Sequence, residues 1–379
     1  MKVIYLCSAL DTGGLERNLL LLTPLLRQQG CEVHVAAAGG LMRDSLVEAG
    51  AIHHELSCDI RNPLALTRDA AKLRRILDSE RPDVVHVFSA APGVVLKIAT
   101  SGLSPGRRPL HVASVMGLQE SADEKAWVTH LRNYLTVLGA DWTYVISPTI
   151  ERYLRKLPIR RSRLTELPVV GIEIPHLPGE ASRAQLRDEV RDELGIPRDH
   201  NIVTTIGYLG PRKSHELFVA AASLVARRRP KTSFLVLGEG PARESLQAQV
   251  DAAGLNGRIL LTGVRRDLDR ILPATDICVK PGVLEGFIGI TVLEAQSFRV
   301  PVVAFDTVDV RMAIEDGKTG MIVERGSVPG LARALEGLLD HPAKAEQLAR
   351  AGRELVVERF AIERVASGLV EAYRDQLRR

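Results

Sequence analysis

The sequence is poor in the residues that mark secreted, metal-binding and nucleic-acid-binding proteins. Its four cysteines, Cys7, Cys31, Cys58 and Cys278, form no CxxC pair and show no metal-ligand spacing. That scarcity indicates small buried side chains in a reducing compartment rather than disulfides or a metal site. Aromatic residues make up only 4% of the chain, which disfavours a base-stacking surface, so we expect no nucleic-acid partner.

Long hydrophobic runs are also missing. No segment reaches the roughly 18 consecutive apolar residues that span a bilayer, and the apolar run near the N-terminus is too short for the core of a signal peptide. We therefore expect a cytoplasmic protein, with attachment to the inner face of the membrane left open. The net charge of +4 suits anionic small molecules or an anionic surface without deciding between them.

The chain is long enough for two domains, and its pattern is that of an α/β fold. It has 379 residues, of which 45% are hydrophobic and 25% charged, values typical of a globular protein with more than one core. Short apolar runs alternate with helical patterns, which predicts parallel βαβ units. The expected strands cover residues 2–7, 31–38, 83–88, 109–115, 141–147, 201–209, 232–238, 258–263, 276–280, 301–305 and 320–323.

A segment rich in proline and glycine, residues 167–180, interrupts this alternation and is interpreted as a linker. We expect Rossmann-like domains at residues 1–170 and 176–360 and a final helix at residues 361–379. Parallel sheets bind ligands at the carboxyl ends of their strands, and clefts between domains are favoured sites. The turns that follow strands are therefore the places to look for function.

Two glycine-bearing turns qualify first. Gly13 and Gly14 follow the first strand and open a helix, where backbone amides attract anions; a turn required only for packing is the alternative. A literal GxGxxG is missing, and the second strand ends without an acidic residue, which argues against a conventional NAD site. Gly238 and Gly240, after a later apolar strand, permit close approach of a ligand, although a lone GxG is weak evidence.

A cationic turn and an acidic turn follow in the second half. In "GYLGPRKSHE", Arg212 and Lys213 stand at a strand-to-helix turn, where either cation could pair with a diphosphate; a solvated lysine is the alternative. In "GVLEGFIGITVLEAQ", a helix is expected to begin near Gly289, with amides that could hold a phosphate. Glu294 lies in an apolar helix and could accept hydrogen bonds from a ribose, and Glu285 could reach a sugar hydroxyl. A surface loop with an outward-facing glutamate is the alternative.

Two further features are weaker. His86 stands near the end of an apolar strand and is a candidate for a ligand contact, although lone histidines are more often structural. A basic cluster without acidic residues could attract anionic lipid head groups, or could equally be a solvated face. Its members are Arg152, Arg155, Lys156, Arg160, Arg161 and Arg163.

Taken together, these motifs resemble the family 4 glycosyltransferases of glycosyl transferase group 1, retaining enzymes with the GT-B fold. The resemblance rests on the order of "GGLER", "RPDVVHVFSA", "RKSHELFVAA", "LVLGEGPARESL", "ILLTGVRRDLDRIL", "ICVKPGVLEGF" and "VLEAQSFRVPVVA". It implies two Rossmann-like domains facing each other across a cleft, with the last helix crossing back to the N-terminal domain. A weaker similarity, in "DVVHVFSAAPGV" and "ASVMGLQ", points to the branch that builds surface polysaccharides on polyprenyl carriers.

The resemblance also implies roles. Lys213 would neutralise the donor diphosphate, the helix start at Gly289, Ile290 and Thr291 would hold the phosphates, Glu294 the ribose, and Glu285 the transferred sugar. The backbone near Val264 and Arg265 would border the base, and Gly13 and Gly14 would approach the reacting centre. The expected activity is transfer from a nucleotide-diphosphate sugar to a glycan or polyprenyl-linked acceptor, without a metal or other cofactor.

Three departures from the family pattern keep alternatives open. Eight residues separate Glu285 from Glu294 where the family usually has seven, Tyr208 stands in place of a frequent arginine, and Met116 in place of a frequent histidine. A nucleotide-sugar epimerase of the same fold and a non-catalytic nucleotide-sugar-binding protein are the two rival interpretations.

Overall fold

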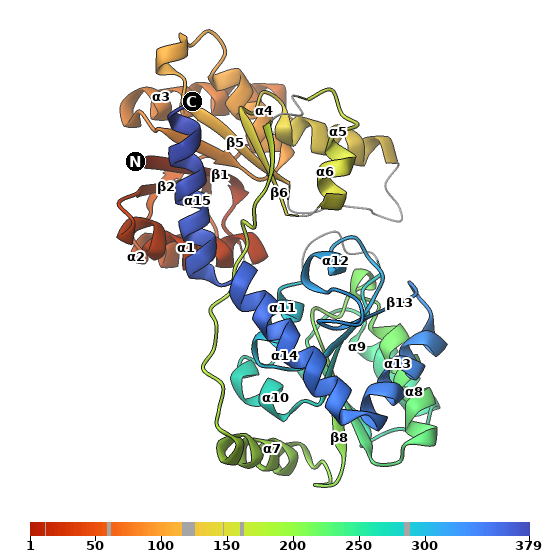
Figure 1. Ribbon diagram of the computed structural model, residues 1–379. Coiled ribbons are helices and arrows are strands. Elements are labelled where there is room, and N and C mark those ends of the chain that lie inside the picture. Colours follow the sequence, from red (N-terminus) through yellow and green to blue (C-terminus); the bar gives the residue numbers. More distant parts are fainter. Residues whose placement is uncertain (12, 59–61, 116–125, 147, 160–162, 284–288) are drawn as a thin grey trace. The chain divides into compact units, whose positions relative to one another are not determined.

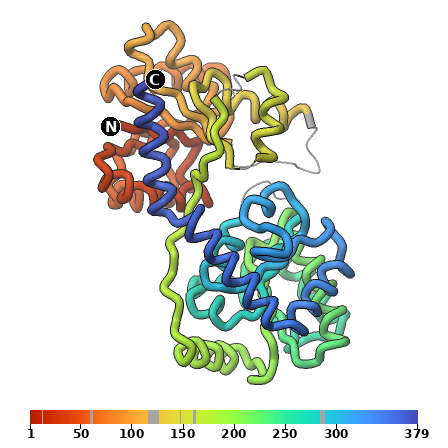
Figure 2. The backbone as a smooth tube through the Cα atoms, in the orientation of Figure 1, coloured from red at the N-terminus to blue at the C-terminus, as the bar shows by residue number. Residues whose placement is uncertain are grey.

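The computed structural model describes residues 1–11, 13–58, 62–115, 126–146, 148–159, 163–283 and 289–379. The chain divides into two compact units (Figures 1 and 2). Unit 1 comprises Met1–Glu173 and Arg359–Arg379, and unit 2 comprises Ile174–Glu358. The chain passes from one unit to the other near residues 173 and 359. Within the described ranges, no helix is long and apolar enough to cross a bilayer.

Unit 1 is built on a parallel sheet with the strand order β3-β2-β1-β4-β5-β6-β7. Its strands are β1 (Lys2–Ala9), β2 (Glu32–Ala38), β3 (Ile52–Glu55), β4 (Val84–Val87), β5 (Leu110–Val115), β6 (Trp142–Val145) and β7 (Leu164–Glu166). Its helices are α1 (Gly14–Gln28), α2 (Arg43–Glu48), α3 (Pro63–Glu80), α4 (Ala90–Ala99), the 3-10 turn η1 (Pro105–Arg107), α5 (Ala126–Val137), α6 (Pro148–Leu154) and α15 (Ile362–Leu377).

Unit 2 holds a second parallel sheet, in the order β10-β9-β8-β11-β12-β13. Its strands are β8 (Asn201–Ile206), β9 (Thr232–Leu237), β10 (Ile259–Gly263), β11 (Ile277–Lys280), β12 (Val302–Phe305) and β13 (Met321–Val323). Its helices are α7 (Glu180–Leu194), the 3-10 turn η3 (Pro211–Lys213), α8 (His215–Arg228), α9 (Arg243–Ala252), α10 (Leu268–Ala274), α11 (Ile290–Ser297), α12 (Val310–Ala313), α13 (Val328–Asp340) and α14 (Pro342–Arg359). The expectation of two Rossmann-like α/β domains is confirmed.

Both faces of the second sheet are covered, which explains why its strands read as continuous apolar runs. Val203 and Val236 face a core that includes Phe218 of α8 and Leu335 of α13. On the other face, Ile202, Leu235 and Leu237 pack with Val190 of α7 and Ile271 of α10. Full burial of such a side chain contributes about 1.5–3 kcal/mol to stability, so these two layers fix the strands whose ends carry the candidate site.

In both sheets an aspartate before one strand accepts a hydrogen bond from a backbone amide of the neighbouring strand. Asp83, just before β4, accepts a hydrogen bond from the backbone N–H of Lys2 at 2.7 Å. Asp276, just before β11, accepts one from the N–H of Ile202 at 2.8 Å. Each carboxylate satisfies a backbone amide in the first two residues of the neighbouring strand. The letters "PD" and "TD" before these apolar runs therefore have a structural reason in each unit.

The C-terminal helix α15 belongs to the core of unit 1 and packs against α1 (Figure 1). Tyr373 is fully buried, and its hydroxyl lies 2.6 Å from Nδ1 of His86 and 3.4 Å from the hydroxyl of Tyr5. The hydroxyl of Tyr144 donates to Gln376 at 2.9 Å. Hydrogen bonds inside an aromatic cluster therefore join α15 to strands that are far away in the sequence.

Two buried histidines make the stability of unit 1 depend on pH. Burial lowers the pKa of His86 to about 3 and that of His111 to about 4, whereas the unfolded chain has the usual value near 6.5. Below pH 6.5 the unfolded chain takes up protons first, so this contribution to stability is complete above pH 6.5 and is lost as the pH falls toward 3–4. We expect a loss of about 1.4 kcal/mol per pH unit for each ring.

Tryptophan fluorescence can measure this effect in unit 1 alone, because both tryptophans, Trp127 and Trp142, lie in that unit. The free energy of unfolding should be followed in denaturant between pH 7 and pH 5. His86→Gln should reduce the slope against pH, and His341→Gln, at an exposed position, should not. Equal slopes in all three proteins would contradict the assignment.

Several elements were not predicted from the sequence. Strands β3 and β7 are among them, because "IHHE" and "LTE" are short and largely polar and form the two edges of the sheet. Helix α7 was also missed, because few of its residues are buried. Its boundary signals are nevertheless present: Gly179 precedes it, and Gly195 ends it in the left-handed conformation (φ 66°).

Candidate functional site

The strand order places a reversal point in each sheet, and the predicted turns lie beside it. In unit 2 the chain runs outward from β8 through β9 and β10 on one side and from β11 through β12 and β13 on the other. The loops after β8 and β11 therefore diverge above neighbouring strands, the position where open parallel sheets bind ligands. The loop after β8 carries Lys213, and the loop after β11 leads to Gly289.

Lys213 lies in the 3-10 turn that links β8 to α8. Its backbone N–H donates to Gly210 at 3.0 Å, and its side chain is half-buried. A Cβ at Gly207 would lie 3.6 Å from Cδ of Lys213, so the aliphatic part of the side chain folds over the end of β8. The neighbouring Arg212 and Tyr208 are exposed. The turn thus keeps the cation at the reversal point.

Gly238 and Gly240 serve a contact different from the predicted one. A Cβ at Gly238 would lie 1.8 Å from the carbonyl oxygen of Gly207, and one at Gly240 would lie 2.4 Å from that of Leu209. The N–H of Leu209 donates to the backbone carbonyl of Glu239 at 2.9 Å. The close approach that these glycines permit is therefore made by the chain's own β8–η3 loop. A ligand contact at Gly238 and Gly240 stays a prediction.

Ion pairs made by Arg265 hold the loop after β10 in place. The Arg265 guanidinium pairs with Asp267 at 2.6 Å and with Glu193 of α7 at 2.5 Å. The hydrogen bond to Asp267 is the largest cause that raises the pKa of Arg265, and the hydrogen bond to Glu193 is the next. The side chain is therefore committed to fixing the loop, whereas Val264 is 63% exposed. That the backbone of Val264 and Arg265 borders a base stays a prediction.

Helix α11 begins at the reversal point without a side-chain cap among the described residues. Gly289 precedes it in an extended conformation, and the N–H of Val292 bonds the carbonyl of Gly289 at 2.8 Å. Ile290 and Thr291 form its first turn. Glu294 follows about one turn later and is half-buried. Burial, and after it the charge of Glu294, raises the pKa of Cys278 on β11 to about 12. The predicted roles at this helix start remain predictions, and Glu285 lies outside the described residues, as does Met116.

A buried ion pair beneath this helix start was not predicted. Nζ of Lys280, at the end of β11, lies 2.9 Å from the Asp309 carboxylate before α12, and the two side chains are 6% and 0% exposed. A Cβ at Gly289 would lie 2.9 Å from Cε of Lys280, so a larger residue there would have to displace the lysine side chain. The sequence signal was a lysine closing the apolar strand "ICVK", but its partner is 29 residues away.

At the reversal point of unit 1, the turn after β1 is partly filled by its own helix. Gly13 precedes α1, and a Cβ there would lie 2.2 Å from a carboxylate oxygen of Glu16. Burial raises the pKa of Glu16. Gly13 and Gly14 are themselves exposed. The carboxylate is the end of a flexible side chain, so a ligand could take its place only by moving Glu16.

The structure contradicts the prediction that His86 contacts a ligand. It is fully buried, with Nδ1 at 2.6 Å from the Tyr373 hydroxyl and Nε2 at 2.6 Å from the Ser114 hydroxyl. Both ring nitrogens are therefore used inside the core, and the ring is not placed to contact a ligand. The prediction failed because position along a strand does not tell which face a side chain takes.

The basic cluster is less positive than its sequence suggests. Arg155 pairs with Glu151, and Arg163 lies 3.1 Å from Asp141. Arg152 and Lys156 are exposed, and Arg160 and Arg161 lie outside the described residues. A lipid partner for this cluster stays a prediction.

Comparison with known proteins gives two family matches that together follow most of the chain. The profile described as "Glycosyl transferases group 1" matches residues 187–355, and that described as "Glycosyltransferase Family 4" matches residues 12–168. These ranges fall in unit 2 and unit 1, respectively.

Two curated relatives differ in how much they share. The alpha-D-kanosaminyltransferase of Streptomyces kanamyceticus is 31% identical over 198 residues, 52% of this chain and 51% of that protein. The UDP-Gal:alpha-D-GlcNAc-diphosphoundecaprenol alpha-1,3-galactosyltransferase of Escherichia coli is 23% identical over 80% of this chain and 78% of its own. The chain thus spans about half of the first relative's length and about four fifths of the second's.

Solved structures extend the likeness to the whole fold. A glycosyltransferase of Rickettsia africae superposes with a TM-score of 0.82 at 17% identity, covering 99% of this chain and 98% of the other. HepE of Anabaena, solved in complex with UDP-glucose, superposes with a TM-score of 0.80 at 18% identity, covering 99% and 100%. At these identities the likeness establishes the fold, which is GT-B.

Proposed function

This chain belongs to the family 4 glycosyltransferases of the GT-B fold, and from that membership we propose that it moves a sugar from a nucleotide-diphosphate sugar to an acceptor hydroxyl with retention at the anomeric carbon. The observation that carries the proposal is that Lys213 and the start of α11 follow two neighbouring strands, β8 and β11, at the reversal point of the sheet. A cation and a helix N-terminus together suit a diphosphate.

The chemistry needs charge stabilisation more than a nucleophile. As the bond from the anomeric carbon to the β-phosphate oxygen breaks, negative charge develops on the departing diphosphate. Lys213 and the amides of Ile290 and Thr291 stabilise that charge, and such preorganised donors are a large source of catalysis. The acceptor oxygen bonds to the anomeric carbon from the same face, and its proton passes to the departing phosphate. We include in the proposal that transfer requires no metal.

The acceptor is proposed to be a glycan or lipid-linked hydroxyl, in cell-surface polysaccharide synthesis at the inner face of the membrane. The support is the Escherichia coli relative, whose name specifies an undecaprenol diphosphate acceptor and which matches 80% of this chain. Arg152 and Lys156 are exposed and are proposed to contact an anionic membrane surface.

A donor screen tests the proposal. The full chain should be incubated with UDP-, GDP-, ADP- and TDP-sugars, with and without polyprenyl-diphosphate sugars or free glycans, and products identified by mass spectrometry. Transfer to an acceptor, unchanged by EDTA, supports the proposal. Release of an epimerised sugar without an acceptor would favour the epimerase, and stabilisation by a donor without transfer to any acceptor would favour the binding protein.

Glu294 provides a prediction for the donor side. Glu294→Gln keeps the shape but removes the charge, and a hydrogen bond between a charged group and a ribose hydroxyl contributes about 1.5–3 kcal/mol. We expect the affinity for the nucleotide diphosphate, measured by calorimetry, to fall by about 10- to 100-fold. The matched control is Glu244→Gln, at an exposed position in the first turn of α9. Donor affinity equal to that of the unmodified chain would remove this role.

A further inference from the structure

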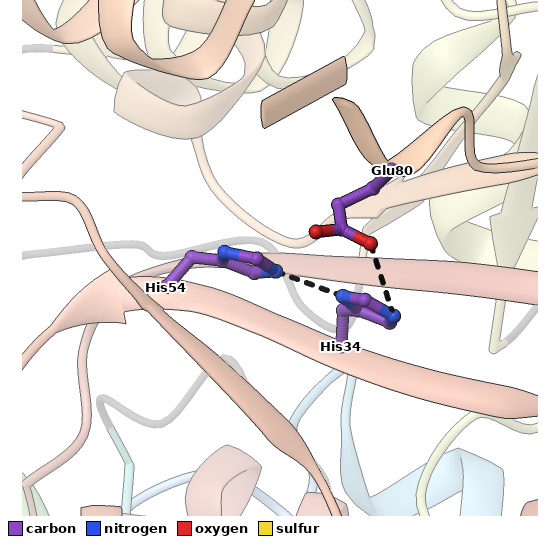
Figure 3. A group of neighbouring side chains, drawn as sticks. All are labelled: His34, His54 and Glu80. Carbon is purple, nitrogen blue, oxygen red and sulfur yellow. Dashed lines mark hydrogen bonds and ion pairs between the residues drawn. The ribbon is translucent and has the colours of Figure 1, made fainter. Parts of the chain in front are cut away.

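Three potential metal ligands meet at the amino-end side of the sheet in unit 1, on elements distant in sequence. His34 lies on β2, His54 on the edge strand β3, and Glu80 is the last residue of α3. Each offers one ligand atom, and these atoms all lie within 4.8 Å of one another. Figure 3 shows the Glu80 carboxylate facing His34, with an oxygen 4.0 Å from Nε2 of that ring. The strand pairing puts His34 opposite Ile52 and Ala36 opposite His54, so both rings project from the same face.

The two rings already face each other through their nitrogens. Nδ1 of His34 lies 2.8 Å from Nε2 of His54, and the rings are nearly parallel, at 8°. Nε2 of His34 lies 2.9 Å from the Glu32 carboxylate. If Nε2 donates its proton to Glu32, Nδ1 presents a lone pair toward His54. Histidines that bind metals are oriented in this way by a carboxylate on the other nitrogen.

The charges around the rings suit a cation. Nζ of Lys2 lies 3.0 Å from Glu80 and 3.3 Å from Glu32, so one positive charge faces two carboxylates. With both rings neutral, the group has a net charge of −1. Its members are Lys2, Glu32, His34, His54 and Glu80. The side chain of His34 is 1% exposed and that of Glu80 is 28% exposed, so Glu80 is the more accessible of these two ligands.

We propose that His34, His54 and Glu80 bind a divalent ion of the Zn²⁺ class, with Glu32 orienting His34. Two imidazole nitrogens and a carboxylate oxygen are ligands that Zn²⁺ accepts at about 2.0–2.2 Å. The ion takes the place of the proton between His34 Nδ1 and His54 Nε2, and the proton of His54 moves to its Nδ1. A tetrahedral ion separates these two nitrogens to about 3.4 Å, a displacement of less than 1 Å from the present distance. The Glu80 carboxylate, now 4.0 Å from Nε2 of His34, turns toward Nδ1 of the same ring to become the third ligand.

The position of this site indicates a structural role. Lys2 and Glu32 begin β1 and β2, so the cluster lies toward the amino ends of the strands, whereas the Gly13 turn follows the carboxyl end of β1. Strand β3 has four residues, lies at the edge of this sheet and pairs with β2. An ion held by β2, β3 and α3 would fasten this short edge strand. It has no part in the proposed sugar transfer, and neither proposal depends on the other.

The experiment uses the full, tag-free chain, stripped with a chelator and titrated with ZnCl₂ in a calorimeter and with CoCl₂ in a spectrophotometer. We expect one equivalent to bind, with the intense visible absorption of tetrahedral Co²⁺. Zn²⁺ should also raise the unfolding temperature reported by tryptophan fluorescence. His54→Gln should weaken Zn²⁺ binding by about 100-fold or more.

The matched control is His53→Gln. His53 is the adjacent residue on β3, is also half-buried, and its ring bonds the carbonyl of Ala37 at 3.1 Å, away from the cluster. It should leave Zn²⁺ affinity unchanged, and Lys2→Gln should increase it by removing the competing cation. No stoichiometric binding, or binding that His54→Gln leaves intact or that His53→Gln abolishes equally, would overturn the proposal.

Discussion

Replacing Lys213 by alanine is expected to lower kcat by about 10²–10³-fold, the loss seen when one donor to a developing negative charge is removed. The reason is its position: the η3 turn holds the side chain over Gly207 at the end of β8, beside the strand whose loop leads to α11. The charge on the leaving diphosphate grows in the transition state, so kcat should fall more than KM rises. Steady-state kinetics with the donor identified by screening measures both.

Two variants sharpen this test. Lys318→Ala removes an exposed lysine of unit 2 that is paired with Glu315 at 3.4 Å and should leave kcat unchanged. Arg212→Ala, one residue before Lys213 and exposed, should have an effect between the two. If Lys213→Ala retained kcat while the protein stayed folded, the leaving group would have to be stabilised elsewhere.

The second large effect is on stability. Removing one partner of a buried ion pair leaves an uncompensated charge and costs about 3–5 kcal/mol. Lys280→Met should therefore strongly destabilise unit 2, because Asp309 remains with its side chain 0% exposed. The double variant Lys280→Met with Asp309→Asn removes both charges and should recover about half of the loss or more, since a buried pair contributes little net stability.

The location of the tryptophans makes this measurable. Both lie in unit 1, so circular dichroism follows both units while tryptophan fluorescence follows unit 1. Lys280→Met should lower the denaturant midpoint of the circular dichroism transition more than that of the fluorescence transition. A double variant less stable than Lys280→Met would contradict the account of an isolated pair, as would a single variant with unchanged stability.

Much of the fold could be predicted from the sequence, because burial on both faces leaves an apolar run at each central strand. Runs such as "KVIYLC" and "TSFLVLG" are β1 and β9 with small changes at their ends. What failed was local: "IHHE" is β3 although three of its four residues are polar, and "EASRAQLRDEVRDEL" is α7 although little of it is buried. In both, pairing or packing with distant residues overrides a weak local pattern.

The site could be predicted in part for the same reason. Strand-end turns identified Lys213 and the start of α11, because the parallel topology brings the turns of β8 and β11 together. His86 was misassigned, and the glycines at 238 and 240 contact the chain itself, because the direction and neighbours of a side chain depend on tertiary structure. The Lys280–Asp309 pair and the His34, His54 and Glu80 cluster are long-range contacts, which one sequence does not reveal.

Hydrogen exchange of backbone amides, with and without a bound nucleotide diphosphate, tests the central claim most directly. The nucleotide should be the one among UDP, GDP, ADP and TDP that stabilises the chain most, at saturation established by calorimetry. The account predicts slower exchange in residues 207–214 and 289–294 of unit 2, which carry Lys213 and the start of α11. Saturated binding with no added protection in either segment, or with protection confined to other loops, would contradict it.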